Sequence, residues 1–233
     1  MRKVSLLLIA ILISLAATAQ NAEPSLSPDD PNAAQAGPVV TFAQNWPAAT
    51  PAFFSVAVSS TGRVAYQSSA KEKAGDPYEV KFTISPENQK LVFQLADHLK
   101  HFHGDWDYKK GKIAFTGTKT LSFKDANNNF TTTYNWSDNL QIQQLTTLFQ
   151  SISETIELGR KLADTYRFDK LGVDAVLKSM EAAAKNNQLA EIQAVQPILS
   201  KLAKDSSLMN ISRRRAEFLL SKISKGAAVA GQP

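Results

Sequence analysis

A strict alternation of apolar and polar residues in the first half of this sequence leaves little choice of secondary structure there. Between Tyr78 and Ile84 every second side chain is apolar, and the intervening ones are Glu, Lys and Thr. A period of two is typical of a β-strand with one buried face. The same period on both sides of Gly62 predicts a hairpin, because glycine readily takes the positive φ that the turn needs.

The elements expected from these patterns form an α+β domain. Ser85 and Pro86 predict the start of a helix as N-cap and first helical residue, and Asp138 predicts the start of a second one. One stripe of each helix and one face of each strand are apolar. We therefore expect one antiparallel sheet with two helices packed on its apolar face. Strands are predicted over 54–59, 64–68, 78–84, 113–115, 120–123 and 130–134, and helices over 86–102 and 138–166.

The pattern changes after Phe168, where only helical periodicity remains. It predicts helices over residues 169–185, 188–204 and 211–224, and Pro197 must kink or split the second. The expectation is a helical hairpin plus a third helix. The predicted organisation is an α+β domain at 39–166, a helical extension at 167–225 and a loose tail at 226–233.

The first 19 residues predict export. A basic start is followed by an apolar run from Val4 to Ala16 and by Ala17-Thr18-Ala19, a small-x-small pattern that signal peptidase accepts. A retained membrane anchor is the alternative, but a run of about 13 residues is shorter than the roughly 20 that a spanning helix needs. We expect a signal peptide at 1–19, a disordered tether at 20–38, and a periplasmic or extracellular protein with no transmembrane segment after cleavage.

Several chemistries are excluded or lack a motif. The chain contains no cysteine, which excludes disulfides, thiolate metal sites and a cysteine nucleophile. It also lacks the G-x-S-x-G, HExxH, phosphate-loop and dinucleotide-binding patterns. No cofactor or catalytic residue is assigned, and the favoured interpretation is a non-enzymatic binding or interaction module.

The order of elements over residues about 50–160 carries a family resemblance. A hairpin that begins at Phe54 and reads F-x-V-x-V-x-x-x-G-x-V-x-Y is followed by a strand, the S-P-E helix start at Ser85, a hairpin over 119–134 and a long helix. This arrangement resembles an uncharacterised family of exported bacterial domains of unknown function. The resemblance implies export and carries no activity. Ala52 and Phe53 stand where many members have a Cys-Pro pair.

The three histidines give the alternative function, a metal-binding protein or metal-dependent enzyme. His98, His101 and His103 lie within six residues, and the first two share a helix face at a spacing that can bind one metal ion. The competing interpretation is electrostatic, because histidines are favoured at the negative C-terminal end of a helix.

The loop that follows contains two aromatic residues between carboxylates. Trp106 and Tyr108 are candidates for stacking on a ligand such as a sugar ring, and the competing interpretation is that they anchor the loop in the core.

Charge is distributed unevenly, with a net charge of −3 over residues 20–159 and +6 over residues 160–233. With Ser212 as N-cap, Arg213, Arg214 and Arg215 fall in the first turn of a helix, where the dipole disfavours cations. One interpretation is an anion-binding patch for an anionic envelope component or a protein partner. The other is a solvated face with one arginine paired to Glu217. A nucleic-acid partner is not expected, since no aromatic-basic recognition motif accompanies the charge.

Overall fold

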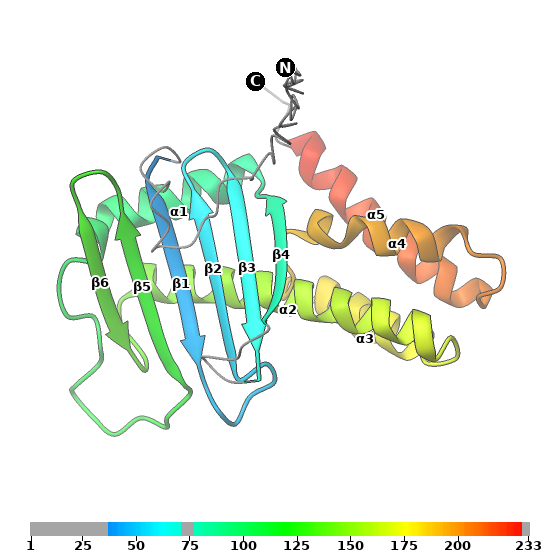
Figure 1. Cartoon of the computed structure of the whole chain (residues 1–233), viewed down its shortest axis with the longest axis horizontal. Coiled ribbons are helices and arrows are strands. Elements are labelled where there is room, and N and C mark those ends of the chain that lie inside the picture. Colours follow the sequence, from blue (N-terminus) through cyan, green and yellow to red (C-terminus); the bar gives the residue numbers. More distant parts are fainter. Residues whose placement is uncertain (1–36, 71–76, 230–233) are drawn as a thin grey trace, which may run out of the picture.

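The computed structural model describes residues 37–70 and 77–229, with side chains as far as Ile223. Its fold is α+β, as expected, and is built on one six-stranded antiparallel sheet (Figure 1). The strands lie in the order β4-β3-β2-β1-β5-β6, so the first strand in sequence is central. They are β1 Val39–Asn45, β2 Phe53–Ser59, β3 Arg63–Ser69, β4 Tyr78–Thr83, β5 Thr118–Lys124 and β6 Asn129–Tyr134.

The helices fall into two groups. Two of them cover one face of the sheet, and the others form a bundle beyond its β4 edge (Figure 1). The first group is α1 Pro86–His98, the short turn η2 Lys100–Phe102 and α2 Leu140–Phe168. The second group is α3 Val173–Lys185, η3 Ile192–Val195, α4 Gln196–Lys204 and α5 Asn210–Val229.

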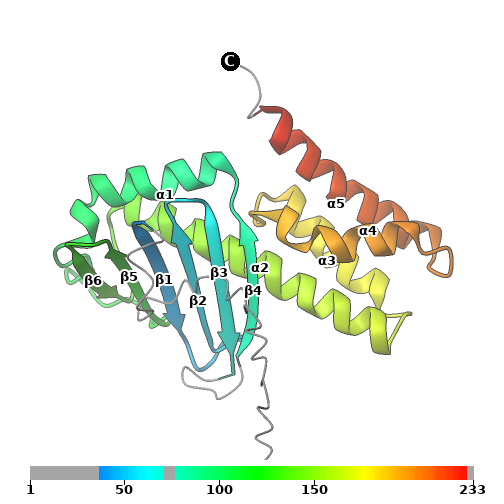
Figure 2. The ribbon, with the colours of Figure 1, turned by 45° about the horizontal axis from the view of Figure 1, so that its top comes forward.

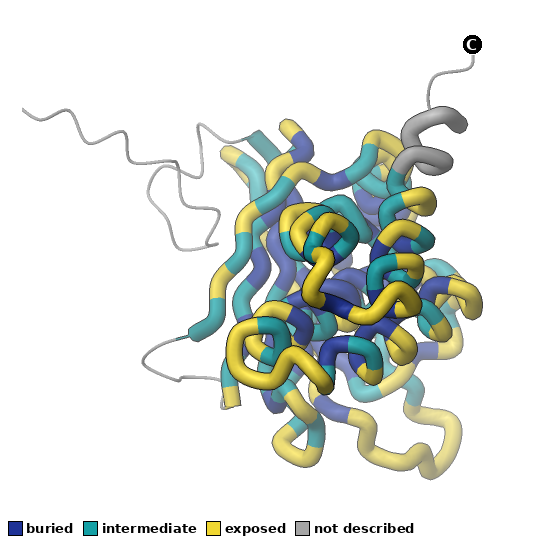
Figure 3. Tube along the Cα trace, turned by 90° about the vertical axis from the view of Figure 1, so that its right-hand side faces the viewer, coloured by how far each residue is buried: buried dark blue, intermediate teal, exposed yellow. Residues whose placement is uncertain are grey.

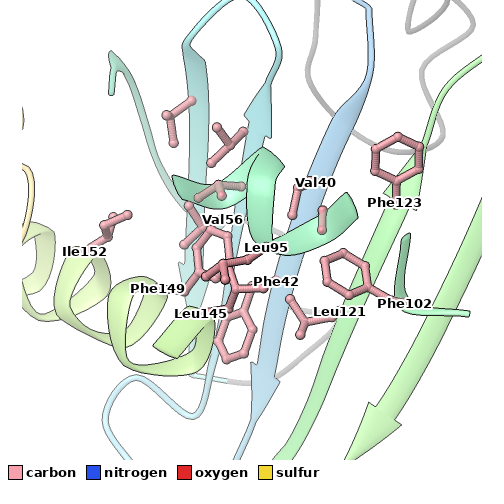
Figure 4. Close-up of a cluster of buried hydrophobic side chains, with 14 of the residues drawn as sticks. Val40, Phe42, Val56, Leu95, Phe102, Leu121, Phe123, Leu145, Phe149 and Ile152 are labelled. Atoms are coloured by element: carbon pink, nitrogen blue, oxygen red, sulfur yellow. The ribbon is translucent and has the colours of Figure 1, made fainter. Parts of the chain in front are cut away.

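The centre of the sheet is held by Phe42 of β1. It pairs with Val56 of β2 and with Leu121 of β5, and its ring stacks on Phe149 of α2 with centroids 5.3 Å apart. All four side chains are fully buried (Figure 4). Because a shift of one residue would turn these side chains to the other face of the sheet, this row fixes the register of the central strands.

Helix α2 belongs to two hydrophobic cores. Its N-terminal half, including Leu145 and Phe149, packs in the core under the sheet, whereas Leu162 packs in the core of the helical bundle. Gly159 lies between these halves and faces Val195 of η3, where a Cβ would overlap the valine side chain. Helix α2 continues past Gly159 to Phe168. The predicted boundary between the α+β domain and the helical extension, at residue 166, falls inside this helix.

Two local predictions for the α+β part are wrong, and one strand was not predicted. Residues 113–115, predicted as a strand, lie in the loop before β5, with Phe115 59% exposed. Helix α1 ends at His98 rather than Phe102, because Lys100 to Phe102 have positive φ and form a left-handed turn. Strand β1 has no counterpart among the predicted elements.

The helix ends also differ from expectation. Asn139, not Asp138, caps α2 through its side-chain oxygen, which accepts hydrogen bonds from the next turn. Pro197 splits the predicted segment 188–204 into η3 and α4, as expected, because it lies in the first turn of α4. Helix α3 starts at Val173 rather than at 169, and α5 continues to Val229, past the predicted start of the tail.

Within residues 37–70 and 77–229, no helix is both long and apolar enough to cross a bilayer. The predicted signal peptide and nearly all of the predicted tether lie outside the described residues.

Candidate functional site

The three histidines point to different neighbours. The imidazole of His101 stacks on Phe123 with centroids 3.9 Å apart, and its Nε2 lies 2.8 Å from Asp97. His103 packs edge-on against Phe130, and His98 contacts a glutamine of α2. In the part of the chain that the structure describes, no three His, Asp or Glu side chains are grouped to hold a metal ion. The metal hypothesis therefore gains no geometric support from these residues.

The two aromatic residues of the loop have different surroundings, and those of Trp106 agree with the interpretation as a core anchor. Trp106 packs against the sheet core and its indole nitrogen is buried without a hydrogen-bond partner among the described residues. Tyr108 packs edge-on against Trp136 instead, with centroids 5.1 Å apart. These two rings help to line a pocket of about 410 Å³. Tyr108 and Trp106 thus do not form one platform, and Trp136 is 38% exposed.

The three arginines also separate. Since α5 begins at Asn210, they lie beyond its first turn, and Ser212 donates a hydrogen bond to Asp174 instead of capping the helix. Arg215 is paired with Asp174 at 3.2 Å and with Glu181 at 3.0 Å on α3. The charge of Arg215 is therefore already matched inside the helical bundle, and anion binding by the three arginines stays a prediction. Arg214 is exposed and Arg213 is partly buried.

A groove of about 1100 Å³ lies where the sheet part meets the bundle, lined by residues of α1, α2, η3 and α5. Figure 2 shows how α1, α2 and α5 are arranged. The lining of the groove is mostly apolar, and no prediction from the sequence placed a site there. Residues from four segments line it: Ile84 and Leu91 beside and within α1, Leu148 and Ser151 on α2, Leu189 and Ile192 around η3, and Lys222 and Ile223 on α5. Ligand sites commonly form at such junctions between two packed units.

Glu191 fixes one wall of this groove. Its carboxylate is buried and accepts hydrogen bonds from the Ser85 backbone N–H and hydroxyl, both at 2.8 Å. The side-chain amides of Asn88 and Gln193 donate to it as well. The carboxylate therefore sits at the N-terminus of α1, where the helix dipole favours negative charge. Because its oxygens are engaged by four donor groups, Glu191 acts here as a link between α1 and the bundle.

A second buried polar cluster ties the sheet to α2. Glu157 accepts hydrogen bonds from the Tyr66 hydroxyl at 2.9 Å and from the Ser68 hydroxyl at 2.5 Å. Burial, together with the Glu157 carboxylate, raises the pKa of Tyr66 far above its usual range, so the phenol stays protonated and donates. Arg160 lies 3.6 Å from the same carboxylate. The partners satisfy one another, which favours a structural role.

Sequence reasoning missed the groove because its parts are far apart in the chain. Ser85 was recognised as a helix cap, but Glu191, its partner, lies 106 positions later. Neither residue belongs to a motif with characteristic spacing. The available signal was limited to the helix start at Ser85.

Comparison with known proteins gives no match, either to a model of a protein family or to a curated protein. The resemblance to exported bacterial domains therefore stays a prediction.

Proposed function

We propose that this protein is an exported, non-enzymatic binding module that holds an amphipathic helix of a partner protein in the groove between α1 and α5. The groove itself carries the proposal. At about 1100 Å³ it lies at the upper limit of the roughly 300–1,000 Å³ typical of small-molecule pockets, and its lining is mostly apolar. An apolar trough between helices suits the apolar face of a further helix.

The chemistry of the lining supports binding over catalysis. Its apolar surface comes from side chains such as Leu91, Leu148 and Ile192, and its one buried carboxylate, Glu191, is engaged in the N-terminal cap of α1. Glu87 and Lys222, both exposed, place opposite charges on opposite walls. Such rim charges would favour one orientation of a bound helix.

A peptide library displayed on phage tests the proposal. Selection against the protein should enrich peptides with apolar residues at positions i, i+3, i+4 and i+7, the spacing of one helix face. The enriched peptides should lose at least tenfold in affinity for Leu148→Glu, since a charge in the apolar floor costs more than about 1.4 kcal/mol. Leu91→Lys, on the α1 wall, should have the same effect.

Leu140→Glu is the matched control. Leu140 is on the same helix, is 78% exposed and does not line the groove. Equal binding of the peptides to the Leu148 and Leu140 variants would contradict the proposal, as would the absence of any enriched peptide. Circular dichroism of each variant checks that the fold is intact.

A further inference from the structure

The far end of the helical bundle exposes large apolar side chains on two adjacent turns. Phe168, the last residue of α2, and Leu171, in the turn before α3, are 76% and 86% exposed. Met209 and Ile211, where α4 turns into α5, are 51% and 47% exposed. We name this end, with its four side chains, the apolar tip. It lies at the right-hand end of Figure 1, and Figure 3 views the molecule from that side.

The two turns are held together by polar contacts beneath the apolar side chains. The Tyr166 hydroxyl donates to Asp205 at 2.8 Å, and the ammonium of Lys170 donates to the Ser207 hydroxyl at 2.9 Å. Lys170 also lies 3.4 Å from Asp205. These polar contacts therefore hold the two turns of the apolar tip next to each other.

Positive charge surrounds the apolar tip. Residues 165–172 and 200–214 carry six Lys or Arg and two Asp, and one of the two carboxylates, Asp205, is taken up by the contacts between the turns. Arg167 lies over the ring of Phe168, at 4.9 Å from its centroid. Arg214 and Lys204 are exposed on the adjoining helices. The apolar tip therefore combines exposed apolar side chains with a surplus of positive charge. This combination complements a surface whose anionic groups cover an apolar layer.

We propose that the apolar tip docks on an anionic lipid surface, with Phe168 and Leu171 entering the interfacial layer and the basic side chains facing the headgroups. Apolar insertion combined with basic residues is the general mode of peripheral membrane binding. A base close to such a surface strengthens binding roughly fivefold, so several together are sufficient for measurable attachment. A protein partner would need a hollow to receive these protruding turns, whereas a lipid layer deforms around them.

This docking is independent of the proposed groove. Helix α5 starts at the apolar tip and reaches the groove at Lys222, so the two sites lie about 20 Å apart along its axis. A membrane-bound copy would thus keep its groove away from the lipid. A negative result for one site does not affect the proposal for the other, because each site is tested with its own set of variants.

Co-sedimentation with vesicles tests the docking, using the chain from Gln20 onward, which keeps every described residue. We expect binding to vesicles of phosphatidylglycerol and phosphatidylcholine in roughly equal parts, and at least tenfold weaker binding to phosphatidylcholine alone. Salt should weaken the attachment, since exposed charges are screened over about 10 Å at 0.1 M. The variant Phe168→Ser/Leu171→Ser should bind about tenfold more weakly, and Arg167→Gln/Arg214→Gln should lose most of the preference for anionic vesicles.

The matched control is Ile113→Ser/Phe115→Ser, which removes two exposed apolar side chains from the loop before β5 and should bind like the parent chain. Leu148→Glu should also bind normally, which separates this test from that of the groove. The absence of cysteine allows a single environment-sensitive dye at Leu171→Cys or at Ile113→Cys. Only the emission maximum of the dye at position 171 should shift to shorter wavelength when anionic vesicles are added.

Three results would overturn the proposal. One is no binding to anionic vesicles at low salt, and another is an equal dye shift at positions 113 and 171. The third is a dimer in gel filtration that becomes monomeric in the Phe168→Ser/Leu171→Ser variant, because the apolar tip would then be covered by a second copy of this chain.

Discussion

The left-handed turn after α1 shows how packing can override the preferences of single residues. Lys100, His101 and Phe102 have φ between 52° and 67°, a conformation that costs L-residues roughly 1–2 kcal/mol each. The turn carries Phe102 into the core, where it is fully buried, and lays His101 on Phe123. These contacts hold a backbone that the local sequence alone would not select.

A pair of glycine substitutions tests this account. Lys100→Gly should leave stability unchanged or raise it by up to about 1 kcal/mol, because glycine takes positive φ without a steric cost. Lys90→Gly, at an exposed site inside α1, should lower the free energy of unfolding by about 1 kcal/mol. Denaturant unfolding of both variants gives the comparison, and equal losses would show that the turn at Lys100 is not left-handed in solution.

At the scale of elements, the sequence predicts the elements that depend on local interactions and misses those that depend on distant partners. Strands β2 to β4 and the start of α1 were predictable, because period-two alternation and the Ser85 cap are local signals. Strand β1 was missed, since its position is set by partners on both sides, β2 and the distant β5. The groove and the apolar tip were missed for the same reason, as each combines turns or helices far apart in sequence.

The close approach of α2 and η3 at Gly159 predicts that alanine at this position has an unusual effect on stability. Alanine normally favours a helix over glycine by about 1 kcal/mol. Gly159→Ala should instead destabilise the protein by about 1–3 kcal/mol, because its Cβ would overlap Val195. The double variant Gly159→Ala/Val195→Ala should be more stable than the sum of the single effects implies. A double-mutant cycle from denaturant unfolding measures this coupling, and simple additivity would contradict it.

The contact between the two turns of the bundle predicts a dependence on pH. Hydrogen bonds from Ser207 and from the Tyr166 hydroxyl hold the pKa of Asp205 well below its usual 3.8. A carboxyl with a depressed folded-state pKa stabilises the protein above its unfolded pKa, and this stabilisation is lost as pH falls through the folded value. The difference in unfolding free energy between the parent and Asp205→Asn should therefore shrink between about pH 5 and about pH 2.

The exposed Asp164, on the same helix as Tyr166, supplies the control Asp164→Asn. A difference between parent and Asp205→Asn that stays constant as the pH falls would show that the contact is not electrostatic.

At the scale of the whole molecule, helix α2 contributes to both cores, and we therefore expect the two cores to unfold as one cooperative unit. All three tryptophans, Trp46, Trp106 and Trp136, precede α2, so their fluorescence reports on the sheet part alone. Leu177→Ala opens a cavity in the core of the bundle and should cost about 2–5 kcal/mol. We expect the tryptophan-detected unfolding midpoint to fall together with the midpoint seen by circular dichroism. An unchanged fluorescence midpoint would mean that the bundle unfolds alone.

The central place of β1 in the sheet governs the order in which the chain can fold. Strands β1 to β4 are neighbours in sequence, and so are β5 and β6, so each set can assemble locally. The two sets meet only through β1, where Thr41 pairs with Ala57 on one side and Ser122, about 80 residues away, on the other. Closing so long a loop is slow, because its entropy must be lost before distant contacts compensate for it. Until that step, the unpaired edges of β1 and β5 are open to pairing with other chains, and the pairing of these two strands closes both edges.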